Sequence, residues 1–223
     1  MPALYLVRHG QASFGTDDYD RLSELGWQQS RWLGEHLAGL GRRFDRVYMG
    51  SLRRHRETWE GIAQGAGYTH APEVRPGLNE YQAELILSAW LPPARAEEAR
   101  QNPDRRAHFR LLREALNAWA AGRLEAPGHL PYAEFVAGVR GVLEEARASD
   151  AENVLVVSSG GPISAAVGEV LGLAPHMVVE LNLQARNSSL TELRANARAM
   201  HCVSFNNIPH LERADRAHAV TYS

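Results

Sequence analysis

The chain has 223 residues and a formal net charge of −2, with 44% hydrophobic and 22% charged residues. This length suits one sizeable domain, or one domain with an insertion. The small net charge gives no general attraction to nucleic acid or to an anionic membrane, and no apolar run approaches the roughly 18 residues of a membrane span. The N-terminal apolar run ends at Arg8, too early for a signal peptide, so we expect a cytoplasmic protein. The single cysteine, Cys202, excludes an intramolecular disulfide and a cysteine-based zinc site.

The first third of the chain alternates short apolar runs with amphipathic segments. Residues 3–8 predict a buried strand, followed by a polar loop. A helix is expected to begin near Ser23, because leucines recur after it at helical spacing. Residues 46–49 predict a second short strand. Ser51 is a candidate N-cap for a helix that runs through Thr58.

Residues 81–130 differ in composition from the rest of the chain. This segment is polar and bears prolines, and then predicts a helix with one face formed by Phe109, Leu112, Leu116 and Trp119. We interpret it as an inserted helical lid within one domain of residues 1–223. After it come an amphipathic helix, a buried strand, a glycine turn and a helix with Pro162 in its first turn, and then two further strands. Strands that alternate with helices predict an α/β fold, a three-layer α/β/α sandwich around a mostly parallel sheet.

Residues that carry chemistry follow these elements directly. Arg8 and His9 end the first strand, and the carboxyl ends of parallel strands are where α/β folds bind ligands. Two arginines occupy the first helical turn of "SLRRHRET", where free backbone N–H groups favour an anion. Glu80 lies in the loop "GLNEY", and the turn "VVSSGG" lets backbone amides approach a ligand. Together they supply a nucleophile, cations and a proton donor, as phosphoryl transfer requires.

The chain resembles the histidine phosphatase superfamily, the phosphoglycerate-mutase-like proteins. The matching pieces, in the family's order, are "LVRHG", "DRLSELGWQQ", "YMGSLRRHRET", "LNE" and "VVSSGG". The resemblance implies that His9 is the nucleophile that becomes phosphorylated, and that Arg8 and Arg54 bind the phosphoryl oxygens. It implies that Glu80 protonates the leaving oxygen and later activates water. It also implies that no metal and no cofactor are needed.

The chain departs from the family pattern at Ser159, where "VVSHGG"-type members have a second histidine. We expect Ser159 and Gly160 to bind the phosphoryl group, although a serine hydroxyl donates one hydrogen bond and carries no charge. Losing a preorganised donor costs roughly 10²–10³ in rate, so the activity could be reduced. Ser159→His should raise the rate if the pocket has room. Gly15 stands where many members carry an asparagine.

The remaining basic residues are expected to be structural or exposed. Arg53, His55 and Arg56 are interpreted as solvated positions, because a helix turns about 100° per residue away from the site. Another histidine could enter the pocket from a different loop, and His201 and His210 are the ones to inspect. A solvated face or a rim that steers a phosphorylated substrate would account for the arginines of the insertion: Arg95, Arg100, Arg105, Arg106, Arg110 and Arg113.

Three functions stay open at this point. The leading hypothesis is a metal-independent phosphatase that hydrolyses a small phosphorylated metabolite through a phosphohistidine on His9. The second is a phosphoglycerate-mutase-type phosphoryl transferase. The third is a catalytically impaired protein that binds a phosphorylated ligand, which Ser159 motivates. Neither nucleic acid nor a membrane is expected as a partner, and the sequence leaves the substrate and the oligomeric state open, a homodimer included.

Overall fold

The computed structural model describes residues 2–13, 20–92 and 105–222. Six strands form one sheet in the order β3–β2–β4–β1–β5–β6. They are β1 (Ala3–Arg8), β2 (Arg46–Met49), β3 (Glu73–Val74), β4 (Asn153–Ser158), β5 (Leu190–Ala195) and β6 (Met200–Asn207). The first four strands in this order are parallel, whereas β5 and β6 are antiparallel to their neighbours. The predicted α/β fold is confirmed, with a mixed sheet.

The helices and short 3-10 turns connect these strands. They are α1 (Glu24–Gly39), α2 (Arg53–Ala66), η1 (Pro76–Leu78), α3 (Ala83–Trp90), α5 (Arg105–Ala120), α6 (Tyr132–Ala148), α7 (Gly160–Leu171), α8 (Pro175–Leu183) and η2 (Ala214–Ala219). Helix α1 begins next to Ser23 as predicted, and the Ser23 side chain caps it by accepting from the N–H of Gly26 at 3.1 Å. Ser51 does not cap α2, because it lies one residue too early and Asn79 binds it instead.

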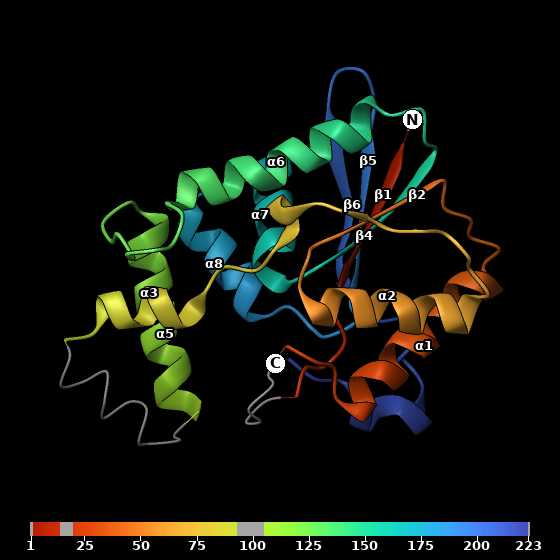
Figure 1. Cartoon of the computed structure of the whole chain (residues 1–223), viewed down its shortest axis with the longest axis horizontal. Coiled ribbons are helices and arrows are strands. Elements are labelled where there is room, and N and C mark those ends of the chain that lie inside the picture. The colour runs from red at the N-terminus through yellow and green to blue at the C-terminus, as the bar shows by residue number, and fades with distance from the viewer. Residues whose placement is uncertain (1, 14–19, 93–104, 223) are drawn as a thin grey trace.

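The central strands bury side chains on both faces, because successive residues of a strand point to opposite sides. Tyr5 and Val7 of β1 pack into a cluster with α1 and α2. Leu4 and Leu6 pack into the other cluster, with α5, α6 and α7. The sheet therefore lies between two helical layers, which are visible in Figure 1 on either side of the central strands.

Helices α1 and α2 approach each other so closely that only glycine fits between them. A Cβ on Gly34 would lie 2.2 Å from the carbonyl oxygen of Ile62, and one on Gly65 would lie 2.1 Å from that of Arg31. Both are backbone contacts that cannot move aside cheaply. This packing fixes α2, and with it the arginine-rich first turn, relative to the end of β1.

The segment predicted to be an inserted lid contributes α3 and α5, which pack on each other beside the sheet, with α5 also against α8 (Figure 1). Its bounds of 81–130 stay a prediction. Leu112, Leu116 and Trp119 are buried as expected, but Phe109, near the start of α5, is 39% exposed. Arg110 and Arg113 are exposed, and Arg113 pairs with a glutamate of α8. Arg95 and Arg100 lie outside the described residues, as do the side chains of Arg105 and Arg106.

Among the helices of the described residues, none is long and apolar enough to cross a membrane.

Candidate active site

The end of β1 places His9 in a buried position with a fixed ring. The side chain is 3% exposed, and its Nδ1 atom lies 2.7 Å from the carbonyl oxygen of Gly10. Because a carbonyl only accepts, Nδ1 carries the hydrogen and Nε2 keeps its lone pair. Burial lowers the pKa of His9 well below its usual value, and the charges of Arg54 and Arg8 act in the same direction. His9 is therefore a neutral base at pH 7.

The first turn of α2 brings Arg54 to His9, and Thr58 joins the two segments. The Thr58 hydroxyl donates to the carbonyl of Arg54 at 2.7 Å and accepts from the N–H of Gly10 at 3.0 Å. Arg54 is buried, and its Nη1 atom donates to Asp20 at 2.7 Å. The same carboxylate accepts from the backbone N–H of Arg53 at 2.8 Å. Asp20 therefore caps the N-terminus of α2, although it lies outside this helix.

Glu80 reaches the site from the loop after η1. The Ser158 hydroxyl donates to the carbonyl of Leu78 at 2.7 Å, which ties this loop to the end of β4. Gly161 donates its N–H to the Glu80 carboxylate at 3.2 Å, and a Cβ on Gly161 would lie 2.1 Å from that carboxylate. A side chain at position 161 would therefore displace the Glu80 carboxylate and the Tyr81 ring where the turn after β4 meets Glu80. Burial raises the pKa of Glu80, which favours the protonated acid, although Gly161, Arg54 and Arg8 act against this.

Arg8 completes the group of predicted residues that the structure brings together. Its Nη1 atom donates to the carbonyl of Ala185 and, at 3.2 Å, to that of Tyr222 near the C-terminus. Its charge acts on the pKa of both His9 and Glu80. A Cβ on Gly160 would lie 3.6 Å from the Nε atom of Arg8, so the turn after β4 also borders the guanidinium.

Ser159 lies fully buried in that turn, and its partner is a histidine. The Ser159 Oγ atom is 2.7 Å from the Nε2 atom of His55, and the rings of His55 and His9 have centroids 5.9 Å apart. His55 is fully buried, so the expectation of a solvated position is wrong, whereas Arg53 and Arg56 are exposed as predicted. The buried stripe of an amphipathic helix is at least about 100° wide, so two consecutive residues can both face inward.

The two histidines that the sequence marked for inspection do not enter the site. His201 is exposed on β6. His210 is buried, but its Nε2 atom lies 2.8 Å from the Oγ atom of Ser188, which contacts the backbone of His9 rather than its ring. Gly15 lies outside the described residues.

Four contributors to the site were missed by the sequence analysis: Asp20, His55, Thr58 and Asn187. His55 carried a usable signal, because His55, Trp59 and Ile62 follow the i, i+4, i+7 spacing of one helix face and the last two are plainly core residues. Asn187 donates to the carbonyl of His9 at 3.3 Å, a contact between distant loops that no local pattern predicts.

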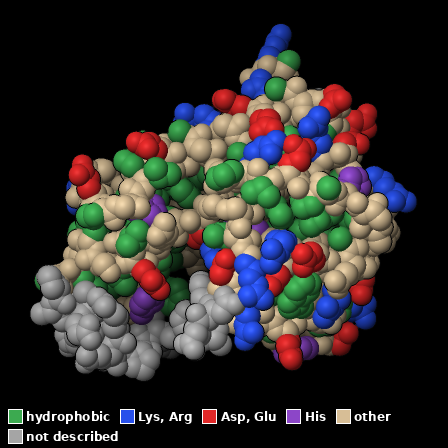
Figure 2. All heavy atoms as spheres, viewed as in Figure 1, with side chains coloured by type: hydrophobic (Ala, Val, Ile, Leu, Met, Phe, Trp, Pro, Cys, Tyr) green, Lys and Arg blue, Asp and Glu red, His purple; other side chains and the backbone are tan. Residues whose placement is uncertain are grey.

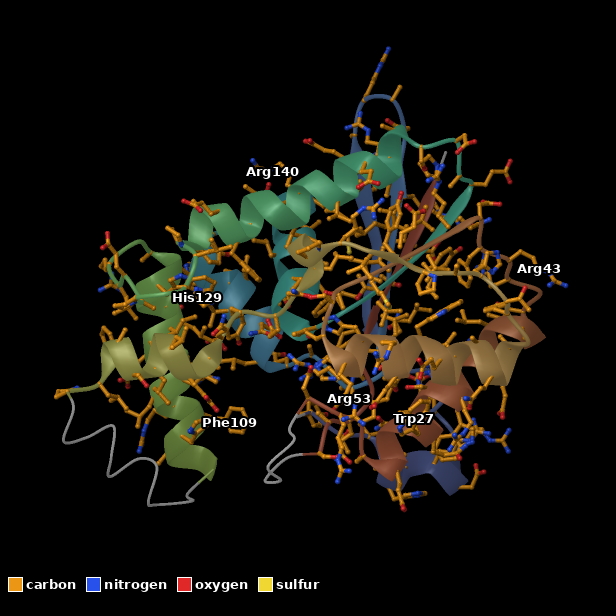
Figure 3. All side chains as sticks on the ribbon, viewed as in Figure 1. Trp27, Arg43, Arg53, Phe109, His129 and Arg140 are labelled. Carbon is orange, nitrogen blue, oxygen red and sulfur yellow. The ribbon has the colours of Figure 1, made fainter. Side chains whose placement is uncertain are left out.

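A small cavity adjoins the Glu80 side of the site at Gly161 and is lined mainly by aromatic and aliphatic side chains. Tyr81, the residue after Glu80, lines this cavity, with its ring centroid 5.7 Å from that of Trp119. The cavity volume is about 20 Å³, enough for about one water molecule. Basic side chains gather on the opposite side, over the first turns of α2 (Figure 2). Phe109 projects from α5 toward the side where Arg53 lies (Figure 3).

Comparison with known proteins identifies the family of the chain. The family model of the histidine phosphatase superfamily, branch 1, matches residues 4–208. A protein named "Putative phosphoserine phosphatase 2" from Hydrogenobacter thermophilus is 26% identical over 224 residues, covering 94% of this chain and 98% of the relative.

Solved structures share the fold. A mutant phosphoserine phosphatase from Entamoeba histolytica in complex with phosphoserine has a TM-score of 0.65 and 20% identity, covering 95% of this chain and all of the other. A mycobacterial glucosyl-3-phosphoglycerate phosphatase has a TM-score of 0.66 and 22% identity, covering 92% and 99%. A phosphoglycerate mutase from Bacillus anthracis has a TM-score of 0.66 and 17% identity, covering 94% of each chain.

The family model places the chain in a class of phosphoryl-handling α/β enzymes. The chain belongs to the histidine phosphatase superfamily, and its family and relatives support a phosphatase, a hydrolase of phosphate esters.

Proposed function

We propose that this protein is a metal-independent phosphatase that hydrolyses a small phosphorylated metabolite through a phosphohistidine on His9. The observation that carries the proposal is the state of His9. Its Nδ1 atom is engaged by Gly10, and the ring is neutral beside the charges of Arg8 and Arg54. A neutral imidazole with an available Nε2 lone pair next to cations is suited to attack a phosphoryl group.

The first step transfers the phosphoryl group to the enzyme. The Nε2 lone pair of His9 forms a bond to phosphorus while the ester P–O bond breaks. Glu80 gives its proton to the leaving oxygen, which departs as an alcohol, and the raised pKa of Glu80 favours this role as acid. Arg8 and Arg54 stabilise the charge on the phosphoryl oxygens, with amides of the turn that contains Gly160.

The second step releases phosphate. Glu80, now ionised, accepts a proton from a water molecule that attacks phosphorus, and the bond between phosphorus and Nε2 breaks. Inorganic phosphate leaves, His9 is neutral again and Glu80 is protonated, so the cycle is complete.

The substrate class rests on two observations. The relatives named above act on or bind small phosphorylated metabolites, phosphoserine and glucosyl-3-phosphoglycerate, by their names and titles. On the Glu80 side, where the leaving group would depart, aromatic and aliphatic side chains line a small cavity. With a net charge of −2, these features favour a small ester over nucleic acid or a membrane surface.

The test is a panel of phosphate esters assayed with wild type and His9→Ala. We expect phosphate release from at least one small ester that His9→Ala lowers by more than about 10³-fold, as for loss of other catalytic nucleophiles. Rapid acid-free quenching should trap a phosphoenzyme that is labile in acid and stable in base, as a phosphohistidine is. Equal rates for the two proteins across the panel would refute the proposal. Isomerisation of a phosphorylated substrate without phosphate release would favour a mutase instead.

A further inference from the structure

A second buried imidazole stands beside the nucleophile, and the reaction described above gives it no task. His55 is fully buried on α2, and its ring centroid lies 5.9 Å from that of His9. Burying a polar ring beside an arginine-rich site is costly unless it is hydrogen-bonded. A leucine or an alanine would fill this part of the helix without the free-energy cost of burying a polar ring. A buried imidazole here therefore suggests a role beyond packing.

The ring of His55 is held on two sides. Its Nε2 atom lies 2.7 Å from the Oγ atom of Ser159. Its Nδ1 atom lies against Gly50, where a Cβ would come within 2.3 Å of it, and the Gly50 backbone acts as an acceptor that raises the pKa of His55 against the effect of burial. Gly50 directly follows β2, and Ser159 directly follows β4, so the ring bridges the ends of two neighbouring strands. It is fixed in position by the sheet itself.

This position coincides with the point at which the chain departs from its family. Position 159 is where the resemblance places a second histidine, and the serine there is too short to reach far into a pocket. Instead, the imidazole that contacts the Ser159 hydroxyl belongs to His55, the residue that follows Arg54. The turn after β4 thus lacks the family's histidine at position 159, and His55 of α2 contacts this turn instead.

We propose that His55 is a positioning residue of the phosphatase site, which orients the Ser159 hydroxyl toward a phosphoryl oxygen. In this arrangement the Nε2–H group of His55 donates to the Ser159 Oγ atom, and the Ser159 hydroxyl donates to the phosphoryl group. The inference rests on the proposed function, because it assigns a task within the same site.

The Gly50 backbone favours a hydrogen on Nδ1 of His55, and the negative charge of a bound substrate favours moving that hydrogen to Nε2, which gives this arrangement. A neutral imidazole has one N–H, and if Nδ1 carried it, the Ser159 hydroxyl would have to donate to Nε2 and would turn only lone pairs toward the anion. With Nε2–H as donor, the serine hydrogen points at the anion instead, and each bond in the chain polarises the next. The pair thus offers a preorganised donor for the phosphoryl oxygens.

The test compares two substitutions of similar size. His55→Gln can place an amide N–H near the position of Nε2, whereas His55→Leu fills the space without a donor. We expect His55→Leu to lower kcat about 10²-fold with little change in KM, because the donor acts most strongly in the transition state. His55→Gln should keep at least about ten times the kcat of His55→Leu. Thermal unfolding of both variants checks that they are folded.

A double-mutant cycle with Ser159 separates a positioning role from a purely structural one. Ser159→Ala should lower kcat to a similar extent, and His55→Leu/Ser159→Ala should be no slower than the slower single variant, since both remove one donor chain. Equal kcat values for His55→Gln, His55→Leu and wild type, or losses that multiply in the double variant, would overturn the inference.

The two proposals fail in different ways. If wild type were no faster than His9→Ala, the phosphatase itself would be refuted. If wild type showed His9-dependent turnover and His55→Leu kept the full rate, only the assignment of His55 would be overturned.

Discussion

Two buried histidine–serine pairs lie on opposite sides of His9. On the side of its ring, His55 meets Ser159 with 2.7 Å between Nε2 and Oγ. On the side of its backbone, His210 meets Ser188 at 2.8 Å, and Ser188 donates its N–H to the carbonyl of His9. Burial lowers the pKa of both histidines to about 3. The pairs have the same chemistry, the same burial and the same titration behaviour.

What distinguishes the pairs is what each one faces. The ring of His55 lies beside that of His9, and Arg54, a proposed phosphate ligand, lowers its pKa further. His210 has His36 and Arg216 as its titratable neighbours, and the carbonyl of His210 accepts from Arg216 at 2.9 Å. A perturbed pKa therefore does not identify a functional histidine here, and the position relative to the nucleophile does.

The largest expected effect comes from breaking each pair at its serine. Ser159→Ala should lower kcat by about 10², because the donor to the phosphoryl group is lost. Ser188→Ala should keep kcat within about threefold and lower the free energy of unfolding by about 1–3 kcal/mol, because the buried Nε2 atom of His210 loses its partner. Steady-state kinetics and urea unfolding measure the two effects. A similar kcat loss in both variants would contradict the distinction between the pairs.

The next largest effect on kcat is expected from placing a histidine at position 159, in the turn after β4. Because the His55 ring fills the space beyond the Ser159 Oγ atom, Ser159→His alone finds no room and should lower both kcat and the melting temperature. In a His55→Ala background the space is empty, so His55→Ala/Ser159→His should be about ten times faster than His55→Ala. Single-turnover rates on one substrate provide the measurement, and a double variant that is slower than His55→Ala would contradict the expectation.

How much of this site the sequence predicts depends on how far apart in the chain the contacting residues lie. The strand end that carries Arg8 and His9 and the helix start that carries Arg54 are local patterns, and the structure brings both to one place. The proposed roles of these residues come from resemblance and stay predictions. The sheet order and the antiparallel β5 and β6 follow from pairing between distant segments, which one sequence does not specify.

His55 shows where local reasoning was too narrow. A turn of about 100° per residue predicts that only Arg54 in its turn faces inward and that the next residue, His55, faces solvent. The buried stripe of α2 is wide enough to include both, and its apolar continuation at Trp59 and Ile62 marks the side on which His55 lies. The contact with Ser159, about a hundred residues away in the chain, required the fold.

A smaller effect concerns stability toward acid, where the two pairs should behave alike. Each histidine has a pKa of about 3 when folded and about 6.5 when unfolded, so the unfolded chain binds more protons between these values. The contribution of these neutral histidines to the free energy of unfolding is fully present above about pH 6.5. It falls as the pH drops, by about 2 kcal/mol per histidine at pH 5. Urea unfolding at pH 7.5 and pH 5.0 should show this loss. His55→Leu and His210→Leu should each reduce it by the same amount, and an effect of only one variant would show that the pairs titrate differently.

The smallest expected effect is on the binding of a non-reacting oxyanion. Arg8, Arg54 and the helix start at Gly160 attract vanadate by charge, without any need for turnover, so vanadate should still inhibit variants whose activity is reduced but measurable. Exposed charges contribute part of this attraction, and raising the salt concentration from about 0.05 M to 0.3 M should weaken inhibition about two- to threefold. Ser159→Ala should weaken it further by removing one donor, whereas Ser188→Ala should not change it. Inhibition constants measured at both salt concentrations would separate the two sides of His9, and an equal response of the two serine variants would mean that Ser159 does not face the anion.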